Sequence, residues 1–488
     1  MFLQGIFLLK KTLILCVVLL FAVACSKSNP CNQTVESATS AKSEKNTITF
    51  VTLNSPNTYY VNSEKAFAGL EYDLAVLFSK YVGENTQVKF IVADSIEKVM
   101  ATIINKQADI AAADLTITDE RSRLIDFSQP YQDVQEQVVY NKDADKKAPQ
   151  NIKDLANANI VIPAASSFAE RLIKLQKTNP GIAWKELNNI HSEKLLEEVA
   201  SGEAEYTIAD SHLVSILQNY YPNLGVAFSL GEPEKIAWGF SKGNKPELLK
   251  KTNDFFAKIK KDGTLRNLLD RYHGNAKRLK PIDVKTYLIR SRTLLPQYKR
   301  LFQQAQEITG LDWRLLAAIS YQESHWDTYN TSPTNVRGLM MLTESTADRM
   351  GVTDRLDPKQ SIPAGAKYIN QLIETIPDRV PEPDRIYMAL ASYNIGYAHL
   401  EDARVLAQKL GMNPDSWADV KKTLVMLSDP QYYANAKYGY CSGGAPVIFV
   451  ESIRSYHNIL TRFEPSYSVP DDNFKIAGDK ILLATSTN

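Results

Sequence analysis

Short apolar runs alternate with amphipathic stretches in the first part of the chain. Residues 48–51 and 88–92 read as strands, and residues 109–113 read as another buried strand. Residues 72–81 and 95–105 instead show apolar positions at helical spacing. Because strands that alternate with helices usually pair in one direction, this order predicts a mostly parallel sheet with helices on its faces.

The same alternation restarts further along the chain. Residues 159–162 and 205–209 are predicted strands, and a helix is predicted at residues 168–177. The segment around residues 238–240 is expected to return the chain to the first sheet. The pattern therefore predicts a two-lobed α/β domain over residues 47–275.

From residue 276 onward the pattern is helical throughout. Proline residues separate the predicted helices, because proline removes a backbone donor and is tolerated mainly at helix starts. The helices are expected at residues 313–326, 345–350, 364–376, 384–394 and 446–462. An all-helical domain is therefore predicted over residues 276–464, followed by a polar tail at 465–488 that is expected to be disordered.

The N-terminus has the pattern of an export signal. Lys10 and Lys11 precede the apolar run 12–24, which is short for a membrane span and ends in Ala-Val-Ala before Cys25. The ending resembles a bacterial lipobox, which implies a signal peptide at residues 1–24, a lipidated Cys25 and a linker at residues 25–46. Ser26 at the next position then implies the periplasmic face of a Gram-negative outer membrane. Ordinary cleavage after Ala24 and an uncleaved anchor are the alternatives.

Length and composition fit a folded protein of two or three domains. The chain has 488 residues, of which 44% are hydrophobic and 23% are charged. With 56 Lys and Arg against 55 Asp and Glu there is no basic surplus, so nucleic acid is not an expected partner. The six His and four Cys show no metal-ligand spacing, so neither a metal nor another cofactor is expected. Cys31 and Cys441 are either paired or free thiols.

The segment around Glu323 carries the candidate chemistry. Asp312 is a potential N-cap, and Leu315, Ile319 and Trp326 recur at helical spacing, so Glu323 lies near the apolar side of a largely buried helix. Burial raises the pKa of a carboxyl group and lets it hold a proton near neutral pH. Cleavage of a glycosidic bond needs such an acid to protonate the leaving oxygen. The alternative is a surface glutamate at a helix end.

Several short motifs after this helix occur in a characteristic order. They are Glu323-Ser324, Ser332-Pro333, Gly338–Met341, Ala391, Tyr393-Asn394 and Gly396. Together they resemble the soluble-lytic-transglycosylase family, which has a goose-type lysozyme-like fold, over roughly residues 290–464. Two departures are Met341, where the family often has Gln, and Phe449, where a hydroxyl-bearing aromatic is common.

The resemblance implies roles for the residues that match. Glu323 corresponds to the family's single catalytic acid and base, and Ser332 to a hydroxyl that helps to place the substrate or the acid. Met340 would form part of an apolar wall over Glu323, and Tyr393 and Asn394 would face the sugar. The substrate would be peptidoglycan glycan strands, cleaved between N-acetylmuramic acid and N-acetylglucosamine to leave 1,6-anhydromuramic acid ends. A lysozyme-like hydrolase and a lipoprotein solute receptor with an inactive lytic domain are the alternatives.

The first domain carries its own set of motifs. They are Gly69–Leu74, Ala108–Asp114, Thr116–Arg121, Asp126–Tyr131 and Ala209-Asp210. They resemble the amino-acid-binding solute-binding protein family over about residues 47–275, which implies that the two lobes form a periplasmic-binding-protein-like fold.

That resemblance implies that Arg121 binds an α-carboxylate and Asp210 an ammonium group, with Ser166 as a further contact. Arg121 could instead pair with a nearby acid at positions 119, 120 or 126. Asp210 and Ser166 could instead cap the helices that follow them.

The two domains in one chain suggest regulation. We expect a cell-wall peptide or an amino acid to bind between the lobes and to change access to Glu323, because closure of the lobes shifts an equilibrium only through differential affinity. A passive targeting role for the binding domain is the alternative.

Overall fold

The computed structural model describes residues 46–61, 66–145, 147–274, 279–332 and 336–468. The predicted signal peptide, Cys25, Cys31 and the tail from residue 469 lie outside these residues. Cys441 lies within them and is a buried free thiol.

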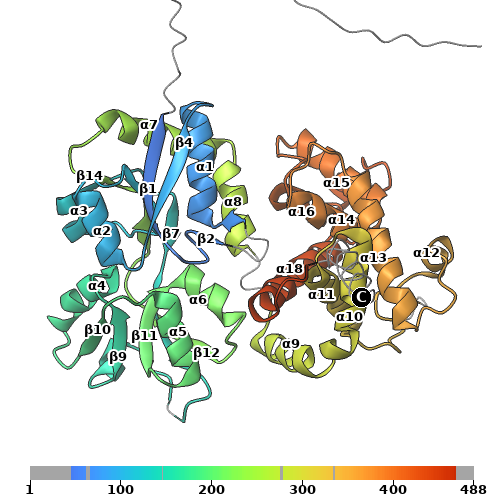
Figure 1. The fold of residues 1–488 in the computed structure, drawn as a ribbon, viewed down its shortest axis with the longest axis horizontal. Coiled ribbons are helices and arrows are strands. Elements are labelled where there is room, and N and C mark those ends of the chain that lie inside the picture. The colour runs from blue at the N-terminus through green and yellow to red at the C-terminus, as the bar shows by residue number, and fades with distance from the viewer. Residues whose placement is uncertain (1–45, 62–65, 146, 275–278, 333–335, 469–488) are drawn as a thin grey trace, which may run out of the picture. The chain divides into compact units, whose positions relative to one another are not determined.

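The first lobe is built on a five-stranded sheet (Figure 1). Its strands, in spatial order, are β4 (Gln87–Ala93), β1 (Thr47–Leu53), β5 (Ile110–Ala111), β14 (Gly239–Ser241) and β6 (Ile125–Phe127). Strand β1 runs parallel to β4 and β5, with Phe50 opposite Phe90, whereas β14 is antiparallel to both of its neighbours. Its helices are α1 (Leu70–Val82), α2 (Ile96–Ile104), α3 (Asp119–Leu124), α7 (Pro246–Lys261) and α8 (Thr264–His273).

Aromatic side chains fill the core of this lobe. Phe50, Phe78, Trp238, Phe255 and Phe256 are all at most 2% exposed, and their rings pack mostly edge-on or tilted. Each such side chain buries a large apolar area, so this cluster contributes strongly to the stability of the lobe. The expected return of the chain to the first sheet near residues 238–240 is confirmed by β14.

The second lobe repeats the plan with a second five-stranded sheet. Its strands, in spatial order, are β10 (Trp184–Leu187), β9 (Ile160–Pro163), β11 (Tyr206–Asp210), β8 (Glu136–Asn141) and β12 (Leu224–Ser229). Its helices are η1 (Ile152–Leu155), α4 (Ser167–Gln176), α5 (Ser192–Ser201) and α6 (Ser211–Gln218). Strand β7 (Gln132–Val134) pairs with β13 (Glu234–Ile236), and β2 (Tyr60–Val61) pairs with β3 (Phe67–Ala68). The two-lobed α/β prediction is confirmed, but each sheet also contains antiparallel strands where the chain crosses over and returns.

The rest of the described chain is helical, as predicted. Its helices are α9 (Pro281–Thr293), α10 (Leu295–Thr309), α11 (Trp313–Ser324), α12 (Glu344–Arg349), α13 (Pro358–Thr375), α14 (Asp384–Ile395), α15 (Tyr397–Lys409), α16 (Trp417–Met426), α17 (Pro430–Tyr433) and α18 (Gly444–Phe463). Helix α11 ends at Ser324, two residues before its predicted end, and the predicted start of α13 was wrong. Helix α13 starts at Pro358, because Asp357 caps it, and continues through Pro363 instead of starting after it.

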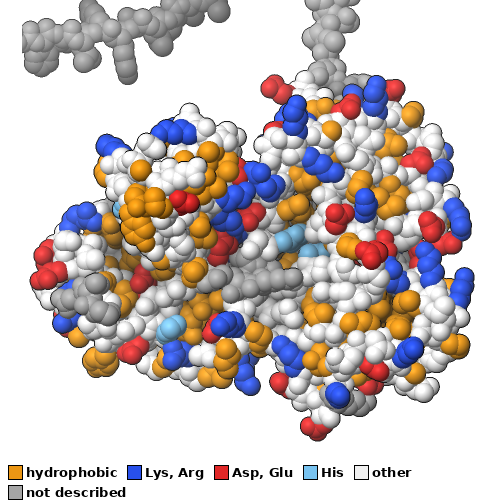
Figure 2. All heavy atoms as spheres, turned by 180° about the vertical axis from the view of Figure 1, so that it is seen from behind, with side chains coloured by type: hydrophobic (Ala, Val, Ile, Leu, Met, Phe, Trp, Pro, Cys, Tyr) orange, Lys and Arg blue, Asp and Glu red, His pale blue; other side chains and the backbone are white. Residues whose placement is uncertain are grey.

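The packed region extends slightly past the predicted end of the helical domain. The carbonyl oxygen of Pro465 accepts a hydrogen bond from Trp313 Nε1 at 3.3 Å, and Arg300 donates to the hydroxyl of Tyr467 at 2.9 Å. These contacts hold the chain against α10 and the start of α11. On the face displayed in Figure 2, acidic, basic and hydrophobic side chains are interspersed.

Candidate active site and ligand-binding cavity

Helix α11 runs through the middle of the helical core. Asp312 caps its first turn, since the Oδ1 atom accepts from the backbone N–H of Arg314 at 2.8 Å. Every residue from Trp313 to Tyr321 is buried, so this helix is apolar nearly all round and is held by packing on every side. Glu323 occupies the last turn, where the helix reaches the edge of the core.

The end of α11 is fixed in an unusual backbone conformation. His325 and Trp326 both have positive φ values, of 53° and 61°. Two such residues in succession are unfavourable for side chains with a Cβ atom and persist only when their surroundings hold them. The buried indole of Trp326 does so by donating to the carbonyl oxygen of Ala317 at 2.9 Å. The last turn that carries Glu323 is therefore anchored from both sides.

The loop that contains the Gly-Leu-Met motif is fastened to α11 by hydroxyl groups. Ser320 and Ser324 each donate to the carbonyl oxygen of Leu339 at 3.0 Å. Gly338 has a φ of 80°, and a Cβ atom there would overlap the carbonyl group of Arg355. Only glycine therefore fits at the start of this loop.

Met340 is buried with its side chain against helix α13. A Cβ atom at Gly365 would lie 2.7 Å from the Met340 side chain, so the glycine leaves the space that this side chain uses. The carbonyl oxygen of Met340 accepts a hydrogen bond of 2.6 Å from the hydroxyl of Tyr393. The loop is thus held between α11, α13 and α14.

Tyr393 also lies close enough to Glu323 to sense its charge. Burial raises the pKa of Tyr393 well above its usual range, and the nearby Glu323 carboxylate raises it further. The Tyr393 ring packs 5.5 Å from Tyr368 and is stacked 6.4 Å from Phe449, measured between ring centroids. The structure therefore brings together three of the residues named from sequence, Glu323, Met340 and Tyr393.

The electrostatics of Glu323 suit a proton donor. Its side chain is partly accessible, yet burial raises its pKa to about 8. Desolvation is the one resolved cause, and no other charged side chain among the described residues contributes. A carboxyl group in this state holds its proton at neutral pH and can give it to a leaving oxygen. Glu323 thus lies at the helix end, as the alternative of a surface glutamate has it, but its side chain is only partly accessible.

The other residues proposed around Glu323 lie at a helix end or in the loop after α11. Asn394 is exposed at the end of α14, next to Tyr393. Ser332 Oγ accepts from the backbone N–H of Val336 at 3.1 Å, within the loop that follows α11. Asp327 is exposed and accepts from the N–H of Tyr329 at 3.0 Å, which is a local turn contact. Sequence reasoning did not single out Ser320 or Gly365, because their function depends on segments far away along the chain.

A second site is a cavity between the two lobes of the α/β domain. It is lined from both lobes, and its walls include Asp114, Thr116, Arg121, Ser166, Glu193 and Asp210. Arg121 is only 5% exposed and donates to the carbonyl oxygens of Thr116 at 3.1 Å and Ala165 at 3.2 Å.

The alternative pairing of Arg121 with nearby acids is wrong. Those acids have other partners: Lys174 pairs with Asp119, Arg123 with Glu120, and Lys242 with Asp126. Arg121 itself forms a long ion pair with Glu170, whose Oε1 lies 3.9 Å from its Nε, and the charges of Asp210 and Glu136 also act on it. This long pair leaves the guanidinium available to a ligand anion.

Asp210 and Ser166 differ in how they use their side chains. Asp210 precedes α6, but its side chain does not cap that helix, and its buried Oδ1 has no hydrogen-bond partner among the described groups. Burial raises the pKa of Asp210 to about 7. Ser166 does cap α4, accepting from the N–H of Ala169 at 3.4 Å, and it also lines the cavity. Capping is thus wrong for Asp210 and correct for Ser166.

Two residues of this cavity region were not proposed from sequence. Nε2 of His212 lies 2.8 Å from Oδ2 of Asp114, although the residues are 98 positions apart. Burial alone would lower the pKa of His212, but the charge and hydrogen bond of Asp114 outweigh it and raise the pKa to about 9. Glu71 holds Asp114 in turn, accepting from its backbone N–H at 3.1 Å. The only sequence signal was the position of His212 two residues after Asp210.

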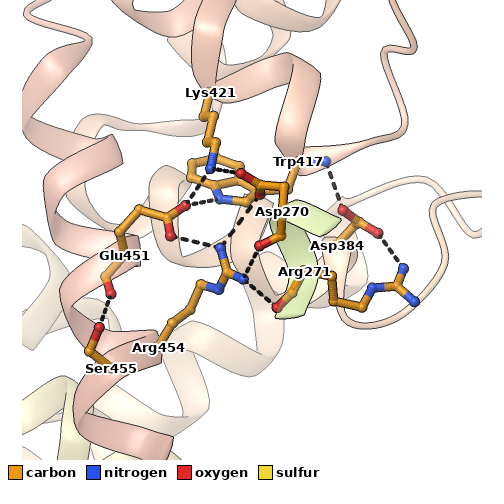
Figure 3. A network of polar contacts seen from close by, with 8 residues as sticks. All are labelled: Asp270, Arg271, Asp384, Trp417, Lys421, Glu451, Arg454 and Ser455. Carbon is orange, nitrogen blue, oxygen red and sulfur yellow. Dashed lines mark hydrogen bonds and ion pairs between the residues drawn. The ribbon is translucent and has the colours of Figure 1, made fainter. Parts of the chain in front are cut away.

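Helix α8 makes a network of charged contacts with α14, α16 and α18 (Figure 3). Lys421 donates to Asp270 at 2.6 Å, and Arg454 donates to the carbonyl oxygens of Asp270 at 3.2 Å and Arg271 at 2.9 Å. Arg271 also pairs with Asp384 at 3.2 Å. Helix α18, which carries Arg454, packs directly on α11. The network therefore joins the last helix of the α/β domain to the helices packed around α11.

Two general features concern cofactors and membranes. Within the described part of the chain, no group of three or more His, Cys, Asp or Glu side chains is arranged to hold a metal ion. In the same residues, no helix has the length and apolar character needed to cross a bilayer.

Comparisons with known proteins match both halves of the chain. Residues 48–275 match the family of bacterial extracellular solute-binding proteins, family 3, and residues 300–414 match the transglycosylase SLT domain. Among solved structures, the substrate-binding protein of an amino acid ABC transporter is 20% identical with a TM-score of 0.41, covering 46% of this chain and 98% of its own. That likeness is too distant to add to the assignment.

Curated relatives cover most of the chain. Membrane-bound lytic murein transglycosylase F of Methylobacillus flagellatus is 55% identical over 430 residues, covering 88% of this chain and 91% of that protein. The protein of the same name from Nitrosospira multiformis is 46% identical over 418 residues, covering 86% of each. The chain therefore belongs to the membrane-bound lytic murein transglycosylase F family and is a peptidoglycan lytic transglycosylase with a solute-binding-like module.

Proposed function

We propose that Glu323 is the single acid and base of this lytic transglycosylase. The protonated carboxyl group gives its proton to the oxygen between N-acetylmuramic acid and N-acetylglucosamine, and the muramyl N-acetyl group assists as that bond breaks. The Glu323 carboxylate then takes the proton of the C6 hydroxyl of the same sugar, whose oxygen closes a 1,6-anhydro ring. The observation that carries the proposal is the desolvated Glu323 carboxyl group, with its pKa near 8, beside Tyr393.

A mechanism with one carboxyl group fits the surroundings of Glu323. Glycosidases with two carboxylates place them on either side of the bond to be cleaved. Among the described residues no second acid affects the pKa of Glu323, and Asp327 is exposed and used in a turn. Product mass separates this mechanism from lysozyme-like hydrolysis, because the anhydro product is one water lighter than the hydrolysis product.

The residues around Glu323 are proposed to position the glycan. Tyr393 and Asn394 at the end of α14 would face the sugar, and Met340 would form the apolar wall that keeps water from Glu323. Ser332 would contribute a hydroxyl from the loop after α11. The fixed loop supports this proposal, because the bond from Tyr393 to the Met340 carbonyl sets the distance between the two elements.

The cleavage reaction should become slower at alkaline pH. Glu323 must be protonated to act first as an acid, and its pKa near 8 means that the protonated fraction of the free enzyme falls tenfold per pH unit above that value. We expect kcat/KM on purified sacculi to be level from about pH 6 to 7.5 and to fall above pH 8. A profile that falls already between pH 4 and 6 would assign the acid to an ordinary solvated carboxyl group.

The binding module is proposed to hold a cell-wall peptide or an amino acid. Arg121 would bind the α-carboxylate, Asp210 the ammonium group, and Ser166 would add a polar contact at the start of α4. The buried unpartnered oxygen of Asp210 and the loosely paired guanidinium of Arg121 support this assignment.

Ligand binding is proposed to change access to Glu323 through α8. Asn57 Nδ2 lies 3.2 Å from Nε2 of His212, and Asn57 Oδ1 lies 2.7 Å from Nε2 of His273 at the end of α8. This chain of polar contacts runs from the cavity to the helix that is ion-paired with α16 and α18. A ligand that closes the lobes would move His212 and Asn57 and thereby shift α8.

Replacement of Arg121 should remove the response to ligand. We expect added muropeptides to change the turnover of wild-type protein by several-fold and to leave the Arg121→Ala variant unaffected, because the carboxylate contact is lost. Arg123→Ala is the matched control, since Arg123 is exposed and pairs with Glu120, three residues before it. Identical rates with and without muropeptides in wild-type protein would leave passive targeting as the role of the module.

The protein is proposed to be anchored in the outer membrane by lipid on Cys25, facing the periplasm, with residues 47–275 and 276–464 as its two modules. The small residues before Cys25 support an anchor, and so does the description of both relatives as membrane-bound. Separation of inner and outer membranes, for wild type and Cys25→Ser, checks this placement.

A further inference from the structure

The cavity of the binding module carries an excess of negative charge. Asp114, Glu193 and Asp210 line it, together with one guanidinium, that of Arg121. His212, which is ion-paired with Asp114, adds a second positive charge next to the cavity. Burial raises the pKa of Asp210 to about 7, so this group is partly ionised at neutral pH, and the three carboxyl groups together still carry more negative charge than the two cations balance. A zwitterionic amino acid, whose net charge is zero, would not change this total.

Each of the three carboxylates also has an unused acceptor. Asp114 Oδ1, Asp210 Oδ1 and Glu193 Oε1 are all buried and have no hydrogen-bond partner among the described groups. Asp210 as a residue is only 8% exposed. A buried acceptor without a donor costs free energy, so a ligand that supplies several N–H donors would be strongly favoured. One ammonium group has three donors, and two ammonium groups have six.

The size of the cavity limits the ligand to about one amino acid. Its volume is about 80 Å³. That is room for roughly three water molecules at the volume that each occupies in liquid water. Entry of one amino acid therefore requires the lobes to open in part, and a sugar with its peptide would require a much wider opening.

We infer that the binding module selects an α-amino acid with a second amino group in its side chain, and that Glu193 binds that second ammonium group. The inference deepens the proposed amino-acid-binding function and rests on it. Arg121 takes the carboxylate and Asp210 the α-ammonium group, which leaves Glu193 in the first turn of α5 for the distal cation. The added positive charge balances the cavity and supplies the missing donors.

Isothermal titration calorimetry of the full chain with L-lysine and L-norleucine tests this inference. The two amino acids share the same six-carbon chain, and only lysine has the distal ammonium group. We expect wild-type protein to bind lysine at least about tenfold more tightly than norleucine, and Glu193→Gln to reduce that preference to less than about threefold. Glu198→Gln, on the same helix outside the cavity lining, should keep the wild-type preference.

Each other outcome is decisive. Equal binding of the two amino acids by wild-type protein, or a preference for lysine that survives Glu193→Gln, overturns the inference and leaves the proposed amino-acid binding standing. Binding of neither amino acid overturns the inference and the amino-acid part of the proposed function together. The proposed catalytic role of Glu323 is independent of all these results.

Discussion

Glu323→Gln is expected to lower the rate of release of 1,6-anhydromuropeptides from purified sacculi by at least about 10³-fold. A glutamine has nearly the same shape but neither gives up a proton as an acid nor accepts one as a base. Loss of a general acid alone typically costs 10² to 10⁴ in rate, and here one group serves both steps. Mass spectrometry of the soluble products measures the rate and also shows whether the wild-type product is the anhydro form.

The control for this variant is Asp327→Asn, which makes the same change of carboxylate to amide four residues later, in the turn after α11. Asp327 is exposed, and an asparagine there can still accept from the N–H of Tyr329. Its rate should stay within about threefold of wild type. If Glu323→Gln kept a rate within tenfold of wild type, another group would have to be the acid.

Glu323→Gln should also be at least as stable to unfolding as the wild-type protein. The pKa of Glu323 is about 8 in the folded protein, against an ordinary value of 4.5. The protonated form therefore stabilises the fold fully below pH 4.5, and this stability is lost as the pH rises toward 8. A glutamine avoids that loss, so Glu323→Gln should gain roughly 1–3 kcal/mol over wild type near pH 7.5, after allowance for partial exposure. Thermal unfolding at pH 4.5 and 7.5 measures the difference.

The fold was largely predictable because the chain's periodicity is clear. Strands such as β1 and β4 are short apolar runs, and α11 has apolar residues on every face, so both could be found from local pattern. The error at α13 has a local cause. Pro363 normally ends or starts a helix, but in α13 the packing of the flanking turns outweighs the one backbone hydrogen bond that a proline removes.

The candidate sites were predictable only in part. Glu323 could be named because its spacing from Ile319 puts it near the buried side of its own helix. The hydroxyl anchors from α11 to Leu339 could not, because they depend on which loop packs against the helix. His212 and Asp114 are a similar case, since an ion pair between residues 98 positions apart leaves no local pattern. Sequence reasoning therefore identified side chains proposed to react or to bind a ligand, and it missed the side chains that fix their positions.

Gly338→Ala should show how much the active site depends on those holding contacts. An added methyl group would overlap the backbone carbonyl of Arg355, which cannot rotate away as a flexible side chain could. The loop would have to shift, and with it the Leu339 carbonyl held by α11 and the Met340 carbonyl bound by Tyr393. We expect a loss of about 3 kcal/mol or more, seen as a fall of roughly 5–10 °C in the unfolding temperature of the lytic domain, and a rate at least about tenfold lower.

Gly351→Ala separates the overlap from backbone strain. Gly351 also has a positive φ, of 72°, but a Cβ atom there would meet nothing within 4 Å. Its alanine variant carries the cost of the left-handed conformation alone, which is about 1 kcal/mol. If the two variants lost equal stability and equal activity, the position of the Gly-Leu-Met loop would not depend on contact with Arg355. If Gly338→Ala lost more stability than Gly351→Ala and also lost activity at temperatures where it is fully folded, catalysis would require the Met340 carbonyl to stay within reach of Tyr393.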